Sequence, residues 1–249
     1  MIGKIKVLLT RYTLEEVKFE LLKMIAKIIF PKYRFMWPQL YWWENEEFNE
    51  YLDKFGERSK NNTDRRWMLN ELLRLTVGIS GNTVECGTYK GASSYLVCKF
   101  NKSKCSKKCH YIFDSFEGLS RPGSEDGKHW QEGDLYSSEK ELKNSLKEFD
   151  NYKVFKSWIP DKFYLLEEER FSFVHIDVDL YQPTHDSIEF FYNRLNKGGV
   201  FVCDDYGVYT CPGATKAIDD FLVDKPEKML ALNCGGGFFI KGVYTSDSF

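Results

Sequence analysis

Two short apolar runs that end in pairs of aspartates constrain the fold of this chain more than any other feature. Residues 171–176 precede Asp177 and Asp179, and residues 200–203 precede Asp204 and Asp205. Apolar runs of this length are typical of strands that are covered on both faces of a parallel sheet. Ligands of such sheets bind beyond the carboxyl ends of the strands, so we expect the four aspartates to meet in one crevice.

Four aspartates in one crevice indicate that a cation binds there. Carboxylates that lie close together repel one another unless a positive charge joins them. Oxygen ligands suit a hard divalent ion, so the residues predict Mg²⁺. A single aspartate after a strand could equally cap a helix or fill a turn. Two pairs of aspartates at two strand ends favour a cation-binding site over a role in helix caps or turns.

The composition is that of an ordinary globular protein. The chain has 249 residues, of which 43% are hydrophobic and 29% are charged, enough for one large domain or one domain with an appendage. The formal net charge of -2 gives no reason to expect a nucleic-acid partner. The 7 cysteines favour a reducing compartment, and we expect no signal peptide and no membrane span, hence a cytoplasmic protein.

The first 62 residues differ in pattern from the rest. Residues 12–30 carry the apolar stripe of an amphipathic helix, and aromatic residues gather between positions 30 and 51. We expect residues 1–62 to form a helical and aromatic appendage, and residues 63–249 to form the main domain. The helix is expected to pack on the main domain or on a partner subunit of a homo-oligomer; a peripheral contact with a membrane surface is the alternative.

From residue 82 onward, predicted strands and helices alternate. Strands are predicted at 83–86, 109–113 and 152–156, before the two strands that carry the aspartates, and a closing pair at 228–232 and 237–241. This order predicts an α/β fold with a doubly wound, mostly parallel sheet. The polar, glycine-rich stretch 120–138 is long for a connection inside a compact domain, which predicts a lid or a binding loop.

The loop after the first strand predicts a ligand site. Gly87 and Gly91 let the backbone approach a ligand and let the next helix start close to the strand. Their spacing is E-x-G-x-x-x-G, which lacks the second close-approach glycine of a dinucleotide site. Asp114 closes the second strand, where an acid can accept hydrogen bonds from ribose hydroxyls. Trp158 follows the third strand and could cover an adenine ring or simply belong to the core.

Three segments together resemble one known family. FDSFEGL at 113–119, HIDVDLYQPT at 175–184 and GGVFVCDDY at 198–206 resemble the macrocin O-methyltransferases. These are class I enzymes that depend on S-adenosylmethionine and Mg²⁺ and methylate sugar hydroxyls. The resemblance spans about residues 65–222. It implies a Rossmann-like class I methyltransferase sheet with an antiparallel final strand, preceded by N-terminal helices.

The resemblance also implies roles for individual residues. Asp177, Asp204 and Asp205 would bind Mg²⁺ or Mn²⁺, and Asp179 would be the general base. Glu85 and Gly87 would contact the methionine end of the cofactor, and Asp114 its ribose. The full predicted cofactor pocket comprises Glu85, Gly87, Thr88, Tyr89, Gly91, Ser93, Asp114, Ser115, Trp158 and Asp177. The sequence departs from the family at Cys203, where an aliphatic residue is usual, and at His175, where arginine is frequent.

The resemblance therefore predicts methylation of a sugar hydroxyl in a glycan or a glycosylated natural product. A metal-dependent O-methyltransferase for a catechol-like hydroxyl is one alternative. An NAD-dependent sugar oxidoreductase is another, although the chain lacks G-x-G-x-x-G and a well-placed Tyr-x-x-x-Lys pair. A metal-dependent hydrolase would leave the Glu85 loop without a function. An inactive binding module would not need the complete set of motif carboxylates.

Overall fold

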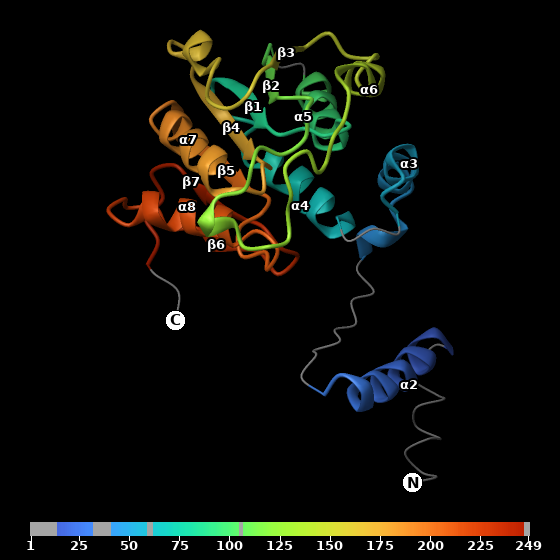
Figure 1. Ribbon diagram of the computed structural model, residues 1–249. Coiled ribbons are helices and arrows are strands. Elements are labelled where there is room, and N and C mark those ends of the chain that lie inside the picture. Colours follow the sequence, from blue (N-terminus) through green and yellow to red (C-terminus); the bar gives the residue numbers. More distant parts are fainter. Residues whose placement is uncertain (1–13, 32–40, 59–61, 105–106, 247–249) are drawn as a thin grey trace, which may run out of the picture. The chain divides into compact units, whose positions relative to one another are not determined.

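The computed structural model describes residues 14–31, 41–58, 62–104 and 107–246 (Figure 1). The chain forms two compact units, residues 1–51 and residues 52–249. None of the described helices is long and apolar enough to cross a membrane.

The first unit contains helix α2 (Leu14–Ile29), a 3-10 helix (Tyr41–Glu44) and the start of α3 (Glu46–Phe55). Helix α2 leaves many large apolar side chains exposed, for example Ile28 at 83%. Trp42 packs edge-on against Phe48, which stacks on Tyr51. Residues 32–40, which hold part of the predicted aromatic segment, lie outside the described residues.

The second unit is built on a seven-stranded sheet in the order β3-β2-β1-β4-β5-β7-β6. The first five strands are parallel, and β7 runs antiparallel to β5 and β6. This confirms the predicted mostly parallel, doubly wound sheet. The strands are β1 (Asn82–Cys86), β2 (His110–Asp114), β3 (Tyr152–Lys156), β4 (Phe171–Ile176), β5 (Leu195–Cys203), β6 (Leu230–Ala231) and β7 (Gly237–Ile240).

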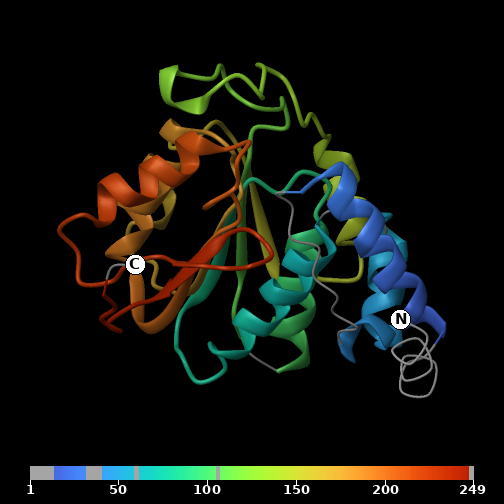
Figure 2. The same ribbon diagram turned by 90° about the horizontal axis from the view of Figure 1, so that it is seen from below.

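Helices cover both faces of this sheet. Figure 2 shows α7 and α8, in orange, on one face, with α4 and α5, in teal and green, on the other. Every position of β4 is buried, because each face of this central strand is covered. The helices of the second unit are α4 (Thr63–Arg74), α5 (Ala92–Ser103), α6 (Glu139–Ser145), α7 (Tyr181–Tyr192) and α8 (Pro212–Leu222), with 3-10 helices at Ser124–Asp126 and Phe163–Leu166.

The carboxyl ends of the central strands are aligned in one row. The Gly87 N–H donates to the Phe113 carbonyl, the Asp177 N–H to the Cys86 carbonyl, and the Asp204 N–H to the Ile176 carbonyl, at 2.8–2.9 Å. Gly87 has φ +79°, and a Cβ at this position would lie 1.9 Å from the Asp177 carbonyl oxygen. A glycine is therefore needed for the ends of β1 and β4 to approach one another so closely.

Candidate active site

A cavity of about 760 Å³ lies beyond this row of strand ends. Its walls come from the loops after all five parallel strands, from the first turn of α4 and from the long loop after β2. Among the residues that line it are Arg65, Arg66, Gly87, Tyr89, Asp114, Ser115, Trp130, Trp158, Asp177, Asp179, Asp204, Asp205 and Cys211. This is the crevice that the sequence predicts at the carboxyl edge of the sheet.

Asp114 forms one wall of the cavity and has limited hydrogen-bonding capacity left. Its Oδ2 accepts the N–H groups of Thr88, at 2.9 Å, and Tyr89, at 3.2 Å, and its Oδ1 accepts the N–H of Phe116 at 2.7 Å. A carboxylate offers about four acceptor positions, so about one remains, on Oδ1. Burial raises the pKa of Asp114 above its usual value, although the three N–H groups partly oppose this.

The other predicted cofactor residues divide between the cavity and the interior. Tyr89, Ser115 and Trp158 line the cavity. Thr88 is buried, with its hydroxyl 2.7 Å from the Ser94 hydroxyl. Ser93 is buried near the start of α5, and Gly91 is the N-cap of this helix, with φ +87°. These last three residues shape the loop rather than contribute to the cavity wall.

Glu85 is fully buried in the sheet and does not line the cavity. It stands opposite His175 in the register of β1 and β4. The Nδ1 atom of His175 lies 2.7 Å from Glu85 Oε1, and the Ser94 hydroxyl donates to Glu85 Oε2. Burial opposes ionisation of Glu85, but hydrogen bonds with His110 and His175 lower its pKa below the usual value.

His175 connects Glu85 to the acidic wall of the cavity. Its Nε2 atom lies 3.7 Å from Asp204 Oδ1. Burial alone would lower the pKa of His175, but the carboxylates of Asp204 and Glu85 raise it to about 10. The imidazole therefore lies between two carboxylates, which favour its protonated form.

The four strand-end aspartates form the acidic wall and divide into two adjacent groups. Ligand atoms of Asp177 and Asp204 lie with one of His175 within 4.8 Å of one another. Asp179 and Asp205 form a similar group with Cys211. The predicted metal ligands Asp177, Asp204 and Asp205 thus line the same cavity but belong to two neighbouring groups.

Crowding and burial shift the pKa values of these aspartates in different directions. Burial, followed by the charge of Asp204, raises the pKa of Asp177 to about 7. Burial raises the pKa of Asp179 to about 6. Burial and the charges of Asp179 and Asp177 raise the pKa of Asp205 well above its usual value. Burial also acts on Asp204, but neighbouring positive charges lower its pKa.

Two arginines of α4, which the sequence pattern does not mark as site residues, supply part of that positive charge. Arg65 Nη1 lies 2.7 Å from Asp204 Oδ2 and donates to the Asp204 carbonyl oxygen at 2.9 Å. Arg66 Nη1 lies 3.9 Å from Asp177 Oδ2, and its Nε donates to Glu57 at 3.2 Å. Arg65 and Arg66 lie in the first turn of α4, and helical periodicity does not indicate which charges they face.

Asp179 has an unusual backbone conformation. Its φ is +60°, which is uncommon for a residue with a side chain. Among the described residues, Tyr89, Phe116 and Leu135 are the other non-glycine residues with positive φ, and Tyr89 and Leu135 also line the cavity. Strained residues of this kind cluster at functional sites.

The donor chemistry of the acidic wall fits a hard divalent cation. The wall presents carboxylate oxygens, which are the preferred ligands of Mg²⁺. Arg65 already places a positive charge against Asp204 Oδ2, as a cation at this position would. Three of the four aspartates have raised pKa values, so a further positive charge would relieve their mutual repulsion.

Two O-methyltransferases of Streptomyces species are similar to part of this chain. The chain is 25% identical over 152 residues to 8-demethyl-8-(2,3-dimethoxy-alpha-L-rhamnosyl)-tetracenomycin-C 4'-O-methyltransferase of Streptomyces olivaceus, covering 56% of this chain and 58% of the relative. It is 24% identical over 156 residues to demethyldecarbamoylnovobiocin O-methyltransferase of Streptomyces niveus, covering 57% and 58%. The matched part thus spans 58% of the length of each of these relatives.

The fold is shared with solved methyltransferase structures. The calicheamicin methyltransferase CalS11 superposes with a TM-score of 0.66 at 16% identity, covering 94% of this chain and 95% of that one. This confirms the predicted class I methyltransferase sheet. The sequence profile of macrocin-O-methyltransferase (TylF) matches residues 66–231, which include the β1 loop, Asp114 and all four strand-end aspartates. The chain therefore belongs to the macrocin-O-methyltransferase (TylF) family.

Proposed function

We propose that this protein transfers a methyl group from S-adenosylmethionine to a hydroxyl of a sugar in a glycosylated natural product or glycan, with the help of a divalent cation. One observation carries this proposal. A single cavity has Asp114 on one wall and the four strand-end aspartates on another. It therefore offers a ribose acceptor and a cation-binding surface around one common space.

Asp114 and the β1 loop provide the binding surface for the methyl donor. The remaining acceptor position on Asp114 Oδ1 suits a ribose hydroxyl. Gly87 lines the cavity without a side chain, so a ligand can approach its backbone. Trp158 is 39% exposed at the cavity, where its ring can cover an adenine face. Methyl transfer is a direct displacement, so the main requirement is that donor and acceptor are held in line.

Asp179 takes the role of general base. A sugar hydroxyl is a very weak acid, and a carboxylate with a reference pKa near ~3.9 is a weak base toward it. Burial raises the pKa of Asp179 to about 6, which brings its basicity closer to the working pH. A divalent cation held by Asp177, Asp204 and Asp205 would lower the pKa of a bound hydroxyl. Arg65 holds Asp204 through an ion pair, and His175 Nε2 lies 3.7 Å from Asp204 Oδ1.

The relatives support a sugar-bearing acceptor. One of them is an O-methyltransferase of a rhamnosyl derivative of tetracenomycin C, and another is an O-methyltransferase of demethyldecarbamoylnovobiocin. Membership of an O-methyltransferase family favours methyl transfer over the hydride transfer of an oxidoreductase. Cytoplasmic location, a homo-oligomer and a membrane contact through the N-terminal helix stay predictions.

A transfer assay tests the proposal. The protein is incubated with S-adenosylmethionine that carries a deuterated methyl group, Mg²⁺ and p-nitrophenyl α-L-rhamnoside as acceptor probe. We expect a mass increase of one deuterated methyl group on the rhamnoside, and loss of the product in excess chelator. Production of NADH from NAD and the same rhamnoside, without methyl transfer, would contradict the proposal.

A further inference from the structure

The long loop after β2 is fixed in position by one buried carboxylate. Asp126 is 4% exposed, and its Oδ1 accepts the N–H of Tyr181, at the start of α7, at 2.6 Å. Its Oδ2 accepts the Gly123 N–H at 2.7 Å. A Cβ on Gly213, in the first turn of α8, would lie 2.0 Å from Asp126 Oδ1. The loop is therefore packed against the starts of both helices.

This packing brings Trp130 to the acidic wall. The indole N–H of Trp130 donates to Cys211 Sγ at 3.3 Å. Trp130 is half-buried against the core and lines the cavity. Cys211 is the residue before α8 and is 2% exposed. The loop thus places the indole N–H of Trp130 against the sulfur atom of Cys211, which lines the cavity.

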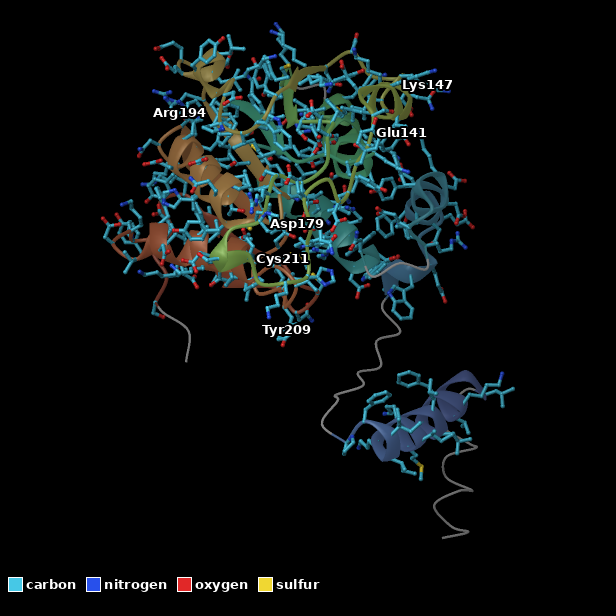
Figure 3. All side chains as sticks on the ribbon, in the orientation of Figure 1. Glu141, Lys147, Asp179, Arg194, Tyr209 and Cys211 are labelled. Atoms are coloured by element: carbon cyan, nitrogen blue, oxygen red, sulfur yellow. The ribbon has the colours of Figure 1, made fainter. Side chains whose placement is uncertain are left out.

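The thiol of Cys211 in turn contacts Asp179. The S–H group donates to Asp179 Oδ1 at 3.4 Å, and Figure 3 shows the two labelled side chains next to one another. These two hydrogen bonds point the same way, from Trp130 to Cys211 and from Cys211 to Asp179. The hydroxyl of Thr210 also lies 3.5 Å from Cys211 Sγ. The backbone of Asp179 is fixed separately, because its N–H donates to Asp205 Oδ2 at 2.8 Å.

We propose that Cys211 and Trp130 are positioning residues for Asp179. The thiol occupies Oδ1 of the carboxylate and leaves Oδ2 to receive the proton of the acceptor hydroxyl. Trp130 holds the thiol in the orientation that this donation needs. The position of the long loop therefore controls the orientation of the base. This inference rests on the proposed function, in which Asp179 is the general base.

Infrared spectroscopy tests the hydrogen-bond chain without an acceptor. The S–H stretching band of Cys211 is isolated by subtracting the spectrum of Cys211→Ala from that of the wild type. We expect Asp179→Asn to shift this band to higher frequency, because an amide oxygen is a weaker acceptor than a carboxylate. Trp130→Phe should also shift it, since the sulfur loses a donor. An unmoved band in Asp179→Asn would overturn the proposal.

A cysteine elsewhere provides the matched control. Cys109 is half-buried at the opposite end of β2 from Asp114, and Cys109→Ala should leave the Cys211 band in place. A shift of that band in Cys109→Ala would show that it does not report the local contact, and would overturn the assignment.

Kinetics with p-nitrophenyl α-L-rhamnoside tests the consequence. Cys211→Ala should lower kcat about tenfold and leave KM for S-adenosylmethionine within about twofold, because the thiol acts on the base and not on the donor. Cys211→Ser should recover kcat to within about threefold of the wild type, because a hydroxyl can also donate. Trp130→Phe combined with Cys211→Ala should be no slower than Cys211→Ala alone, since Trp130 acts through the sulfur.

The outcomes separate the inference from the proposed function. Additive losses in the double variant, or Cys211→Ser as slow as Cys211→Ala, would overturn the inference while methyl transfer stands. Failure of the wild type to methylate the rhamnoside would count against the proposed function, while the infrared result still decides whether Cys211 and Trp130 hold the Asp179 carboxylate.

Discussion

The guanidinium of Arg65 lies 2.7 Å from the carboxylate of Asp204, between Nη1 and Oδ2. The same nitrogen donates to the Asp204 carbonyl at 2.9 Å, and Nη2 donates to Asn62 at 2.5 Å. The side chain of Arg65 is 18% exposed and that of Asp204 is 6% exposed. Helix α4, which precedes all strands of the sheet in the sequence, thus supplies a positive charge to Asp204 at the end of β5.

Removal of Arg65 should destabilise the metal-free protein and make its stability more dependent on cations. Arg65→Gln leaves the buried charge of Asp204 without this partner, at a cost of about 2–3 kcal/mol in unfolding free energy. We expect MgCl₂ to restore more stability to Arg65→Gln than to the wild type. Urea denaturation with and without MgCl₂ measures both effects. Arg74→Gln, in an exposed ion pair on the same helix, is the control and should change little.

The aspartates should differ in function. Asp204→Asn should weaken cation binding, because an amide is a poorer ligand for a hard cation than a carboxylate. Asp179→Asn should lower turnover and leave cation affinity nearly unchanged, because Asp179 acts on the acceptor proton. Titration with Mn²⁺ followed by electron paramagnetic resonance compares the two variants. Equal loss of Mn²⁺ from both would make Asp179 a ligand and would require another base.

The stability of the chelator-treated protein should fall as pH rises from about 4 to about 7. Burial and the charge of Asp204 raise the pKa of Asp177 from 3.8 to about 7 in the folded state. In this window the folded protein holds a proton that the unfolded chain has lost, so each increase in pH favours unfolding. Urea denaturation across the window should show a shallower fall in Asp177→Asn than in the exposed control Asp161→Asn. Equal slopes would be evidence against the crowded acidic wall.

The long loop should lose its restraint when Asp126 is replaced. Asp126→Ala leaves the N–H groups of Tyr181 and Gly123 without their acceptor, at a cost of about 1–3 kcal/mol. We expect faster hydrogen exchange in residues 120–138 and little change in β4. The exposed neighbour Glu125→Ala is the control. Unchanged exchange in Asp126→Ala would show that other contacts position the loop.

The sequence predicted the sheet and the row of acidic strand ends because both depend on local pattern. Short buried runs identify parallel strands, and parallel strands place Asp177 and Asp204 at one edge. The sequence predicted a lid or a binding loop at 120–138, and Asp126, within this stretch, anchors it to the start of α7. The local sequence does not indicate the role of Asp126, because Tyr181, whose N–H its side chain accepts, is 55 residues away.

The contacts that tune the site depend on long-range packing. Arg65 and Asp204 are separated by 139 positions, and Trp130 and Cys211 by 81. Helical periodicity identifies a face of α4 but not the charge that it meets. The pairing of Glu85 with His175 follows from the register of β1 and β4, so this contact could be predicted only once the strand order was known.

Calorimetric titration with S-adenosylmethionine tests most directly the central claim that this cavity binds a methyl donor. We predict that the wild type binds S-adenosylmethionine and S-adenosylhomocysteine and shows no binding of NAD. Asp114→Ala should weaken both interactions by roughly ten- to a hundredfold, since a hydrogen bond to a charged acceptor contributes about 1.5–3 kcal/mol. The exposed control Asp150→Ala should bind like the wild type. Binding of NAD in place of S-adenosylmethionine, or full affinity in Asp114→Ala, would contradict the account.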